Sequence, residues 1–208
     1  MGPMARSTLT TEIAAAAARL VVDEGMEYGP AKRKAARDLG GRSTRSVDLP
    51  SNEAIEDSVR ELLALFHAED QPAELAALRR HALRWMQRLA ELRPHLAGAA
   101  WRGTATRRSC LHLDLYCDDP KAAEIALINL GLDYDTASAA AGSRGEPVPV
   151  LTLASRCDEL GETLAVHLHV HDLDDLRGAL KPDARGRTLR GDAGALRRLI
   201  VETEGAGA

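Results

Sequence analysis

Pro94 separates two parts of the chain in which apolar residues recur at different intervals. Before Pro94, apolar side chains return every three or four residues, which is the spacing of amphipathic helices. After it, they alternate with polar side chains over short runs, as in strands that bury one face. The sequence therefore predicts an α+β fold, with a helical lobe over residues 1–93 and a small mixed β-sheet domain flanked by helices over residues 94–208.

Four helices are expected in the first part, over residues 10–24, 31–39, 51–66 and 72–93. Gly25 ends the first helix, because glycine adopts the left-handed conformation of a helix end without strain. Ser51 or Asn52 caps the third helix, whose apolar stripe extends to Phe66. The apolar stripe of the fourth helix fits either packing within the chain or the interface of a homodimer.

The second part is expected to hold five strands and three helices. The strands cover residues 96–101, 110–117, 134–138, 148–153 and 164–171. The helices follow Asp119, span residues 173–180 and begin at Asp192. Residues 141–147 and 181–190 are expected to be loops.

The bulk properties exclude several classes of protein. The formal net charge is −4, whereas a general nucleic-acid binder needs a basic footprint. The cysteines Cys110, Cys117 and Cys157 have no paired spacing, which indicates free thiols. No apolar leader opens the chain, and no apolar run approaches the roughly 20 residues of a membrane span. We therefore expect a cytoplasmic protein that has no membrane partner and does not bind nucleic acid.

One pair of segments carries a recognisable motif. Leu96-Ala97-Gly98-Ala99-Ala100-Trp101-Arg102-Gly103 is followed by Ser109-Cys110-Leu111-His112-Leu113. These segments resemble the signature of the polymerase-β-like nucleotidyltransferase superfamily. In that family a strand ends in Leu-Phe-Gly-Ser, an Arg-Gly pair follows, and the next strand carries Ser-Asp-Ile-Asp-Leu. Gly98, the Arg102-Gly103 pair and the frame of Ser109, Leu111 and Leu113 fall at the family's spacing.

The residues that make the family's motif catalytic are altered in this chain. Two carboxylates one residue apart on a strand point the same way and hold paired magnesium ions. Their positions are occupied by Cys110 and His112, which are poor ligands for a hard cation. Shifting the frame by two residues pairs His112 with Asp114 and recovers one carboxylate. The family's third carboxylate lies on a later strand, where this chain offers histidines until Asp172.

The resemblance implies a nucleotidyltransferase fold and the transfer of a nucleoside monophosphate from a nucleoside triphosphate to an unidentified acceptor. The site residues that it implies fall into four groups. Gly98, Arg102 and Gly103 would cradle the triphosphate, Arg107 or Arg108 would offset its charge, His112 and Asp114 would be catalytic, and Mg²⁺ or Mn²⁺ would bind His112, Asp114, His169 and Asp172. The helical lobe is also similar to that of bacterial members of the superfamily.

A second interpretation is a relative that keeps the fold and has lost catalysis. Cys110 and His112 at the carboxylate positions favour such a pseudoenzyme, which would bind a nucleotide or a protein. Cys110 also permits a different chemistry: its thiol and His112 share a strand face, and Arg108 nearby would favour the thiolate. A buried structural thiol explains the same residues.

A run of alternating histidines suggests a metal site. His167, His169 and His171 point to one face of a strand and, with His112, would chelate zinc or nickel. The alternative is a solvated polar face opposite Val166, Leu168 and Val170.

The basic helix over residues 31–39 suggests a third function. It resembles the start of a helix-turn-helix repressor, in which Lys32, Arg33, Lys34 and Arg37 would face DNA phosphates. No recognition helix follows before Pro50, since residues 42–49 are few and polar. A solvated basic face packed against the acidic third helix explains the same charges.

Overall fold

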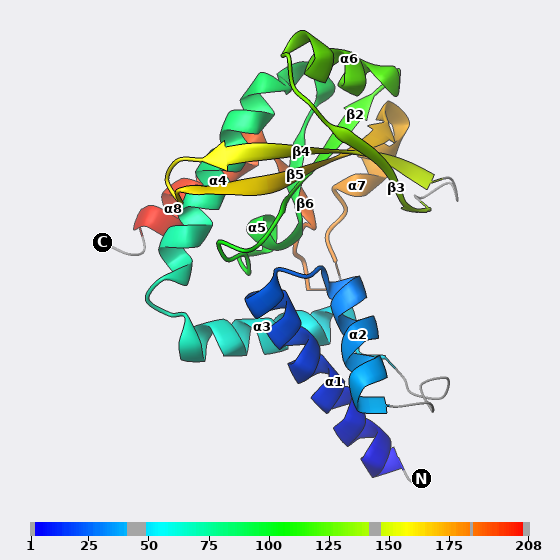
Figure 1. The fold of residues 1–208 in the computed structure, drawn as a ribbon, viewed down its shortest axis with the longest axis vertical. Coiled ribbons are helices and arrows are strands. Elements are labelled where there is room, and N and C mark those ends of the chain that lie inside the picture. Colours follow the sequence, from blue (N-terminus) through cyan, green and yellow to red (C-terminus); the bar gives the residue numbers. More distant parts are fainter. Residues whose placement is uncertain (1–2, 41–48, 142–146, 184, 206–208) are drawn as a thin grey trace. The chain divides into compact units, whose positions relative to one another are not determined.

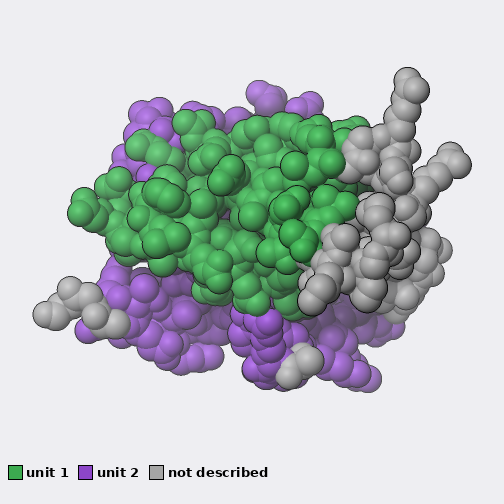
Figure 2. Space-filling model, turned by 90° about the horizontal axis from the view of Figure 1, so that it is seen from below, with its two compact units in different colours: residues 1–72, 104–109 green, residues 73–103, 110–208 purple. Residues whose placement is uncertain are grey.

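The computed structural model describes residues 3–40, 49–141, 147–183 and 185–205. It confirms the predicted α+β fold, with helices before and around a mixed six-stranded sheet (Figure 1). The chain divides into two compact units, coloured separately in Figure 2. Unit 1 comprises residues 1–72 and 104–109, and unit 2 comprises residues 73–103 and 110–208.

Unit 1 contains three helices, α1 (Pro3–Glu24), α2 (Tyr28–Gly40) and α3 (Asn52–Phe66). α1 starts earlier than predicted, because residues 4–9 include neither glycine nor proline to end it. Its predicted end is confirmed: Gly25 has a φ of 68°. A Cβ atom at Gly25 would lie 2.2 Å from the carbonyl oxygen of Arg108, so only glycine fits.

The core of unit 1 is built largely from alanine and β-branched residues. Its members include Ile13, Ala17, Val21, Ala31, Ile55 and Val59. Tyr28 closes this core, and its hydroxyl lies 3.2 Å from the Thr104 hydroxyl. The predicted cap of α3 is confirmed, since the Ala54 amide donates to Ser51 Oγ at 3.1 Å. Phe66, placed on the apolar stripe, is instead 73% exposed because it is the last residue of the helix.

The sheet lies in unit 2 and has the strand order β3-β4-β5-β2-β1-β6. The strands are β1 (His95–Ala97), β2 (Leu111–Cys117), β3 (Asp135–Ala141), β4 (Pro147–Cys157), β5 (Glu162–Asp172) and β6 (Arg190–Asp192). β2 and β5 are parallel, and the other neighbours are antiparallel. Strands far apart in the sequence, β2 and β5, therefore form the middle of the sheet.

The helices of unit 2 are α4 (Gln71–Arg88), which begins in unit 1, α5 (Gly98–Arg102), α6 (Lys121–Asn129), α7 (Leu176–Ala179) and α8 (Ala193–Gly205). Short 3₁₀ turns cover Ala90–Leu92 and Leu173–Asp175. α4 ends before Pro94, and Arg93 takes a left-handed φ of 47°. Within the described residues, no helix has the length and apolarity needed to cross a membrane.

Two predictions for this unit are wrong. The strand expected over residues 96–101 ends at Ala97, because Gly98 turns the chain with a φ of 70° and α5 follows. β6 lies where a loop and the start of a helix were expected, and it pairs with β1 over three residues. β2 begins at Leu111, so Cys110 precedes the strand.

The two faces of the sheet differ in chemistry. Leu111, Leu113 and Leu115 on β2 lie on one face with Val166, Leu168 and Val170 on β5, and all six are buried. Helix α4 covers this apolar face, since His81 and Trp85 of α4 both hydrogen-bond to Ser155 on β4. α8 lies beside α4, where Arg79 donates to the Thr203 hydroxyl at 3.1 Å. The opposite face carries the polar residues of the central strands.

Candidate functional site

Five of the chain's seven histidines lie on the polar face of the unit-2 sheet. Strand register brings them together: His112 pairs with His167, Asp114 with His169, and Tyr116 with His171. On the other side of β2, His95 pairs with Asp114. We call this surface the histidine face; its members are His95, His112, Asp114, Tyr116, Thr152, His167, His169, His171 and Arg190.

Two imidazoles at the centre of the histidine face are hydrogen-bonded to each other. His112 Nδ1 lies 3.0 Å from His169 Nε2. The His112 ring also stacks on His167, with ring centroids 4.9 Å apart. Burial is the main cause that lowers the pKa of His169 to about 4, and the neighbouring histidines act in the same direction against the charge of Asp114. His169 is therefore neutral at pH 7.

Asp114 is the anionic centre of the face. It is 6% exposed, and its carboxylate accepts from Arg190 at 2.8 Å and from His171 Nε2 at 3.3 Å. Burial alone would raise the pKa of Asp114, but the hydrogen bond from His171 and the charge of Arg190 outweigh it and place the pKa below its usual value. The same Arg190 nitrogen donates to the Tyr116 hydroxyl at 2.8 Å. The carboxylate is thus ionised and already has two partners.

The edges of the face are also held by hydrogen bonds. The Thr152 hydroxyl lies 2.9 Å from His167 Nδ1. His95 Nδ1 donates to the Arg93 carbonyl at 2.9 Å, and its ring meets Tyr116 edge-on at 5.2 Å. The face is therefore a half-buried, hydrogen-bonded polar surface on the opposite side of the sheet from Val166, Leu168 and Val170.

Gly98 brings the turn after β1 against the centre of the face. A Cβ atom at Gly98 would make a tight contact of 3.2 Å with His112 Cδ2, and the φ of 70° is one that residues with a side chain rarely adopt. Gly103, at the other end of α5, has a φ of 84° and ends that helix. The predicted glycines therefore hold special backbone positions, one of them beside His112.

The remaining candidate site residues lie in three places. His112 and Asp114 lie on the same face of β2, two residues apart, which is the pair that a shift of the family's motif by two residues gives. Asp172 lies at the end of β5, where its carboxylate accepts from the Asp174 amide at 2.8 Å and caps a 3₁₀ turn. Arg107 and Arg108 are exposed residues of unit 1. Their predicted role toward a phosphate stays a prediction, as does that of Arg102.

A metal site was predicted from the same residues. Among the residues that the structure describes, no three side chains of His, Cys, Asp or Glu are arranged to hold a metal ion. The cysteines Cys110, Cys117 and Cys157 are free thiols, as expected. Cys110 lies outside β2, so the strand geometry that suggested a pair with His112 is absent.

Sequence reasoning missed Arg190 and Tyr116 as members of the face. Tyr116 follows the same alternation as His112 and Asp114, which is a signal that was available. Arg190 comes from β6, 76 residues after Asp114 in the sequence, and nothing in its local sequence indicated a strand.

A second buried polar cluster lies on the apolar face of the sheet around Ser155. Its hydrogen bonds show that Ser155 is not an activated nucleophile. Arg84 Nη2 lies 3.2 Å from His81 Nδ1. Because a guanidinium only donates, Nδ1 is the unprotonated nitrogen, and Nε2 donates to Ser155 Oγ at 2.8 Å. Trp85 Nε1 donates to the same oxygen at 2.8 Å. Ser155 accepts both hydrogen bonds and faces no base, so it is a structural acceptor.

Comparison with known proteins gives little support for an assignment. No protein-family model matches the chain. No curated protein matches it. Among solved structures, the Cid1 poly(U) polymerase bound to MgGTP matches with 13% identity and a TM-score of 0.32, over 50% of this chain and 33% of that one. The chain thus spans one third of the length of that polymerase, and a likeness of this size does not establish a family.

Proposed function

We propose that the histidine face binds the phosphate chain of a nucleoside triphosphate in a nucleotidyltransferase-like domain, without metal-dependent transfer. One observation carries the proposal: the Gly98 turn lies against His112, and register places His112, Asp114 and His169 side by side on β2 and β5. A backbone turn next to N–H donors suits an anion, since phosphate oxygens accept from amides, imidazoles and guanidinium groups.

The imidazole pair provides the donors. In the neutral pair, one ring nitrogen donates and the other accepts, so only one N–H is shared between His112 and His169. A phosphate nearby favours a second proton on the pair, because an opposite charge stabilises the protonated imidazole. Both nitrogens then donate to the ligand. Binding is therefore expected to take up a proton and to strengthen as the pH falls toward the pKa of His169, which is about 4 in the free protein.

The donor set does not fit the two magnesium ions of metal-dependent transfer. Asp114 is the one carboxylate at the centre of the face, and Arg190 and His171 already use its oxygens. Hard cations prefer several oxygen ligands, whereas the other central groups are imidazoles. Asp172 caps a turn at the strand end. These contacts favour binding over turnover.

Nucleotidyl transfer to an acceptor is the second candidate. A single observation favours it: His112 and Asp114 occupy alternate positions of one strand and point to the same face, as the two metal ligands of a transferase do. This candidate requires Arg190 and His171 to release Asp114.

Labelled nucleoside triphosphates distinguish the two candidates. The full chain is incubated with each triphosphate, with and without Mg²⁺ or Mn²⁺, and the melting temperature, pyrophosphate release and self-labelling are measured. A rise in melting temperature without release or label supports binding. Release of pyrophosphate supports transfer. The absence of both stabilisation and release for all four triphosphates refutes both.

Matched variants localise the binding. His169→Ala removes the central imidazole, and His67→Ala removes one from the end of α3 in unit 1. We expect the nucleotide to stabilise His67→Ala as it does the wild type and to stabilise His169→Ala less, with affinity reduced about tenfold for the loss of one charged hydrogen bond. Melting without nucleotide shows whether each variant is folded.

A further inference from the structure

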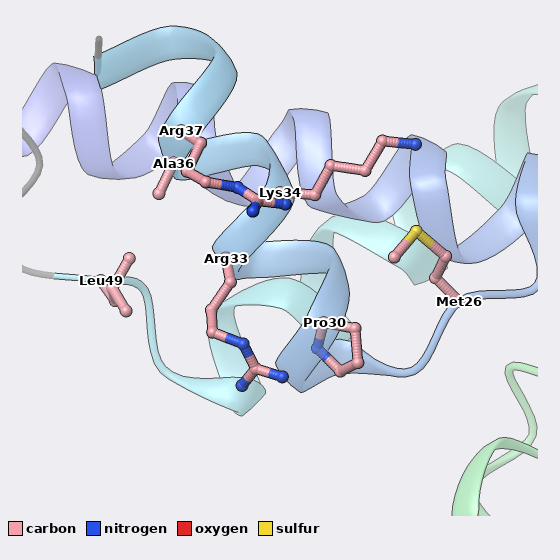
Figure 3. Close-up of a pocket in the computed structure, with 7 residues that line it drawn as sticks. All are labelled: Met26, Pro30, Arg33, Lys34, Ala36, Arg37 and Leu49. Carbon is pink, nitrogen blue, oxygen red and sulfur yellow. The ribbon is translucent and has the colours of Figure 1, made fainter. Parts of the chain in front are cut away.

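Unit 1 contains a hollow on α2 that the nucleotide proposal does not use. Its volume is about 490 Å³. The apolar part of its lining consists of Met26, Pro30, Ala36 and Leu49, which are labelled in Figure 3. Hollows of this size are typical of sites for small molecules.

The polar part of the lining is entirely cationic. Arg33, Lys34 and Arg37 line the hollow, and no acidic residue does so among the described residues. Arg33 and Arg37 are four residues apart on α2, so they lie on the same side of the helix. Like charges at this spacing repel each other, and an anion between them relieves the repulsion.

The lysines of α2 differ from these two arginines in having partners within unit 1. Lys34 pairs with Glu24 at 2.8 Å, and Lys32 donates to Asn52 at 3.0 Å. The side chains of Arg33 and Arg37 make no hydrogen bond or ion pair to any residue that the structure describes. Two guanidinium groups that have no partner among the described residues thus border a hollow with an apolar lining.

We propose that this hollow binds a small organic anion, with an apolar body between Met26, Pro30 and Leu49 and a carboxylate, sulfonate or phosphate head at Arg33 and Arg37. The planar fork of a guanidinium matches two oxygens of such a head group. DNA is a poorer fit: two of the four cations on α2 are already held by Glu24 and Asn52, and DNA offers no apolar body for the hollow.

The test uses 1-anilinonaphthalene-8-sulfonate, a fluorescent probe with an aromatic body and one sulfonate. The full chain is titrated with the probe, and the binding curve is compared for the wild type, Arg33→Gln, Arg37→Gln and Arg19→Gln. Arg19 is an exposed arginine of α1 that does not line the hollow, so its variant controls for net charge. Naphthalene-1-sulfonate and neutral 1-naphthol then compete for the probe.

The proposal expects one saturable site in the wild type and in Arg19→Gln. Affinity is expected to fall about tenfold in Arg33→Gln and in Arg37→Gln, as for the loss of one charged hydrogen bond. The sulfonate is expected to compete at least about tenfold better than the naphthol by the same reasoning. Misfolding cannot imitate this result, because loosely packed states bind the probe more and not less.

Three results of the probe titrations overturn the proposal, and a DNA titration can add a fourth. These are the absence of saturable binding, equal affinity in both arginine variants and the wild type, or equal competition by sulfonate and naphthol. A separate titration with duplex DNA at physiological salt has a defined outcome as well: if the wild type shifts DNA and the arginine variants do not, these arginines bind DNA phosphates and the small-anion site is refuted. None of these results depends on the histidine face.

Discussion

The imidazoles of His112 and His169 hydrogen-bond to each other across two parallel strands, Nδ1 to Nε2, at 3.0 Å. A shared hydrogen bond of this kind needs one proton between two nitrogens. Since the pKa of His169 is lowered to about 4, this imidazole stays neutral near pH 7. At the centre of the histidine face, the neutral His169 therefore lies near the ionised carboxylate of Asp114, which pairs with the cationic Arg190.

The partly buried His169 makes stability fall in acid. Its pKa is about 4 in the folded chain and about 6.5 when unfolded, so below pH 6.5 the unfolded chain binds more protons. Stability is full above pH 6.5 and is lost as the pH falls to about 4, by roughly 3 kcal/mol from this group. Urea unfolding of the wild type and His169→Gln at several pH values measures the loss.

Burial also lowers the pKa of His81, so the wild-type curve contains a second contribution of the same sign. The difference between the wild-type and His169→Gln curves isolates His169. It is expected to change between pH 6.5 and pH 4 and to be constant above pH 7. Parallel curves over the whole range would contradict the assignment.

Removing one partner of the ion pair between Asp114 and Arg190 is expected to lower the stability of the fold. Asp114→Asn leaves Arg190 without its charge partner on a half-buried surface. The expected loss is roughly 3 kcal/mol, the lower end for buried pairs, because the Arg190 side chain is 23% exposed. Arg190→Met and the double variant complete a cycle in which the coupling energy is expected to exceed about 1 kcal/mol. Additive losses would mean that the pair contributes no coupling.

Gly98 couples backbone conformation to His112. Gly98→Ala forces an alanine into a φ of 70° and places a Cβ atom 3.2 Å from His112 Cδ2. Gly161→Ala is the matched control, since Gly161 has a φ of 66° and open space around it. Both variants are expected to lose about 1–2 kcal/mol of stability. Only Gly98→Ala is expected to lose stabilisation by nucleoside triphosphate. If the nucleotide stabilises both variants equally, this turn is not part of the binding site.

Local spacing predicted some members of the histidine face but not how they come together. Alternation along β2 and β5 placed His112, Asp114 and the three later histidines on the faces they occupy. The pairing of β2 with β5 depends on contacts between residues more than 50 positions apart, which no local pattern encodes. The same holds for Arg190.

The segment after Ala97 shows a second limit. Five residues, Gly-Ala-Ala-Trp-Arg, are too few for a helical period to be read, and the apolar run suggested a strand. The φ of Gly98 and the packing of Trp101 decide the outcome, and both depend on the neighbouring strands. The prediction that Phe66 belongs to the buried stripe of α3 is wrong for a related reason. The apolar pattern of the sequence continues to Phe66, but no neighbouring surface among the described residues covers this residue.

Gly191 on β6 is expected to tolerate no side chain, because the Trp101 ring occupies the space. A Cβ atom there would lie 2.0 Å from Trp101 Cη2, and the Trp101 indole is fixed by its hydrogen bond to the Thr188 carbonyl at 2.9 Å. Gly191→Ala is expected to cost about 3 kcal/mol, the upper part of the range for overpacking. Gly178→Ala in α7 is the matched control, since nothing lies within 4 Å and alanine favours the helix. Urea unfolding is expected to show Gly178→Ala as neutral or stabilised and Gly191→Ala as strongly destabilised, and equal stability of the two variants would show that Trp101 does not pack against β6.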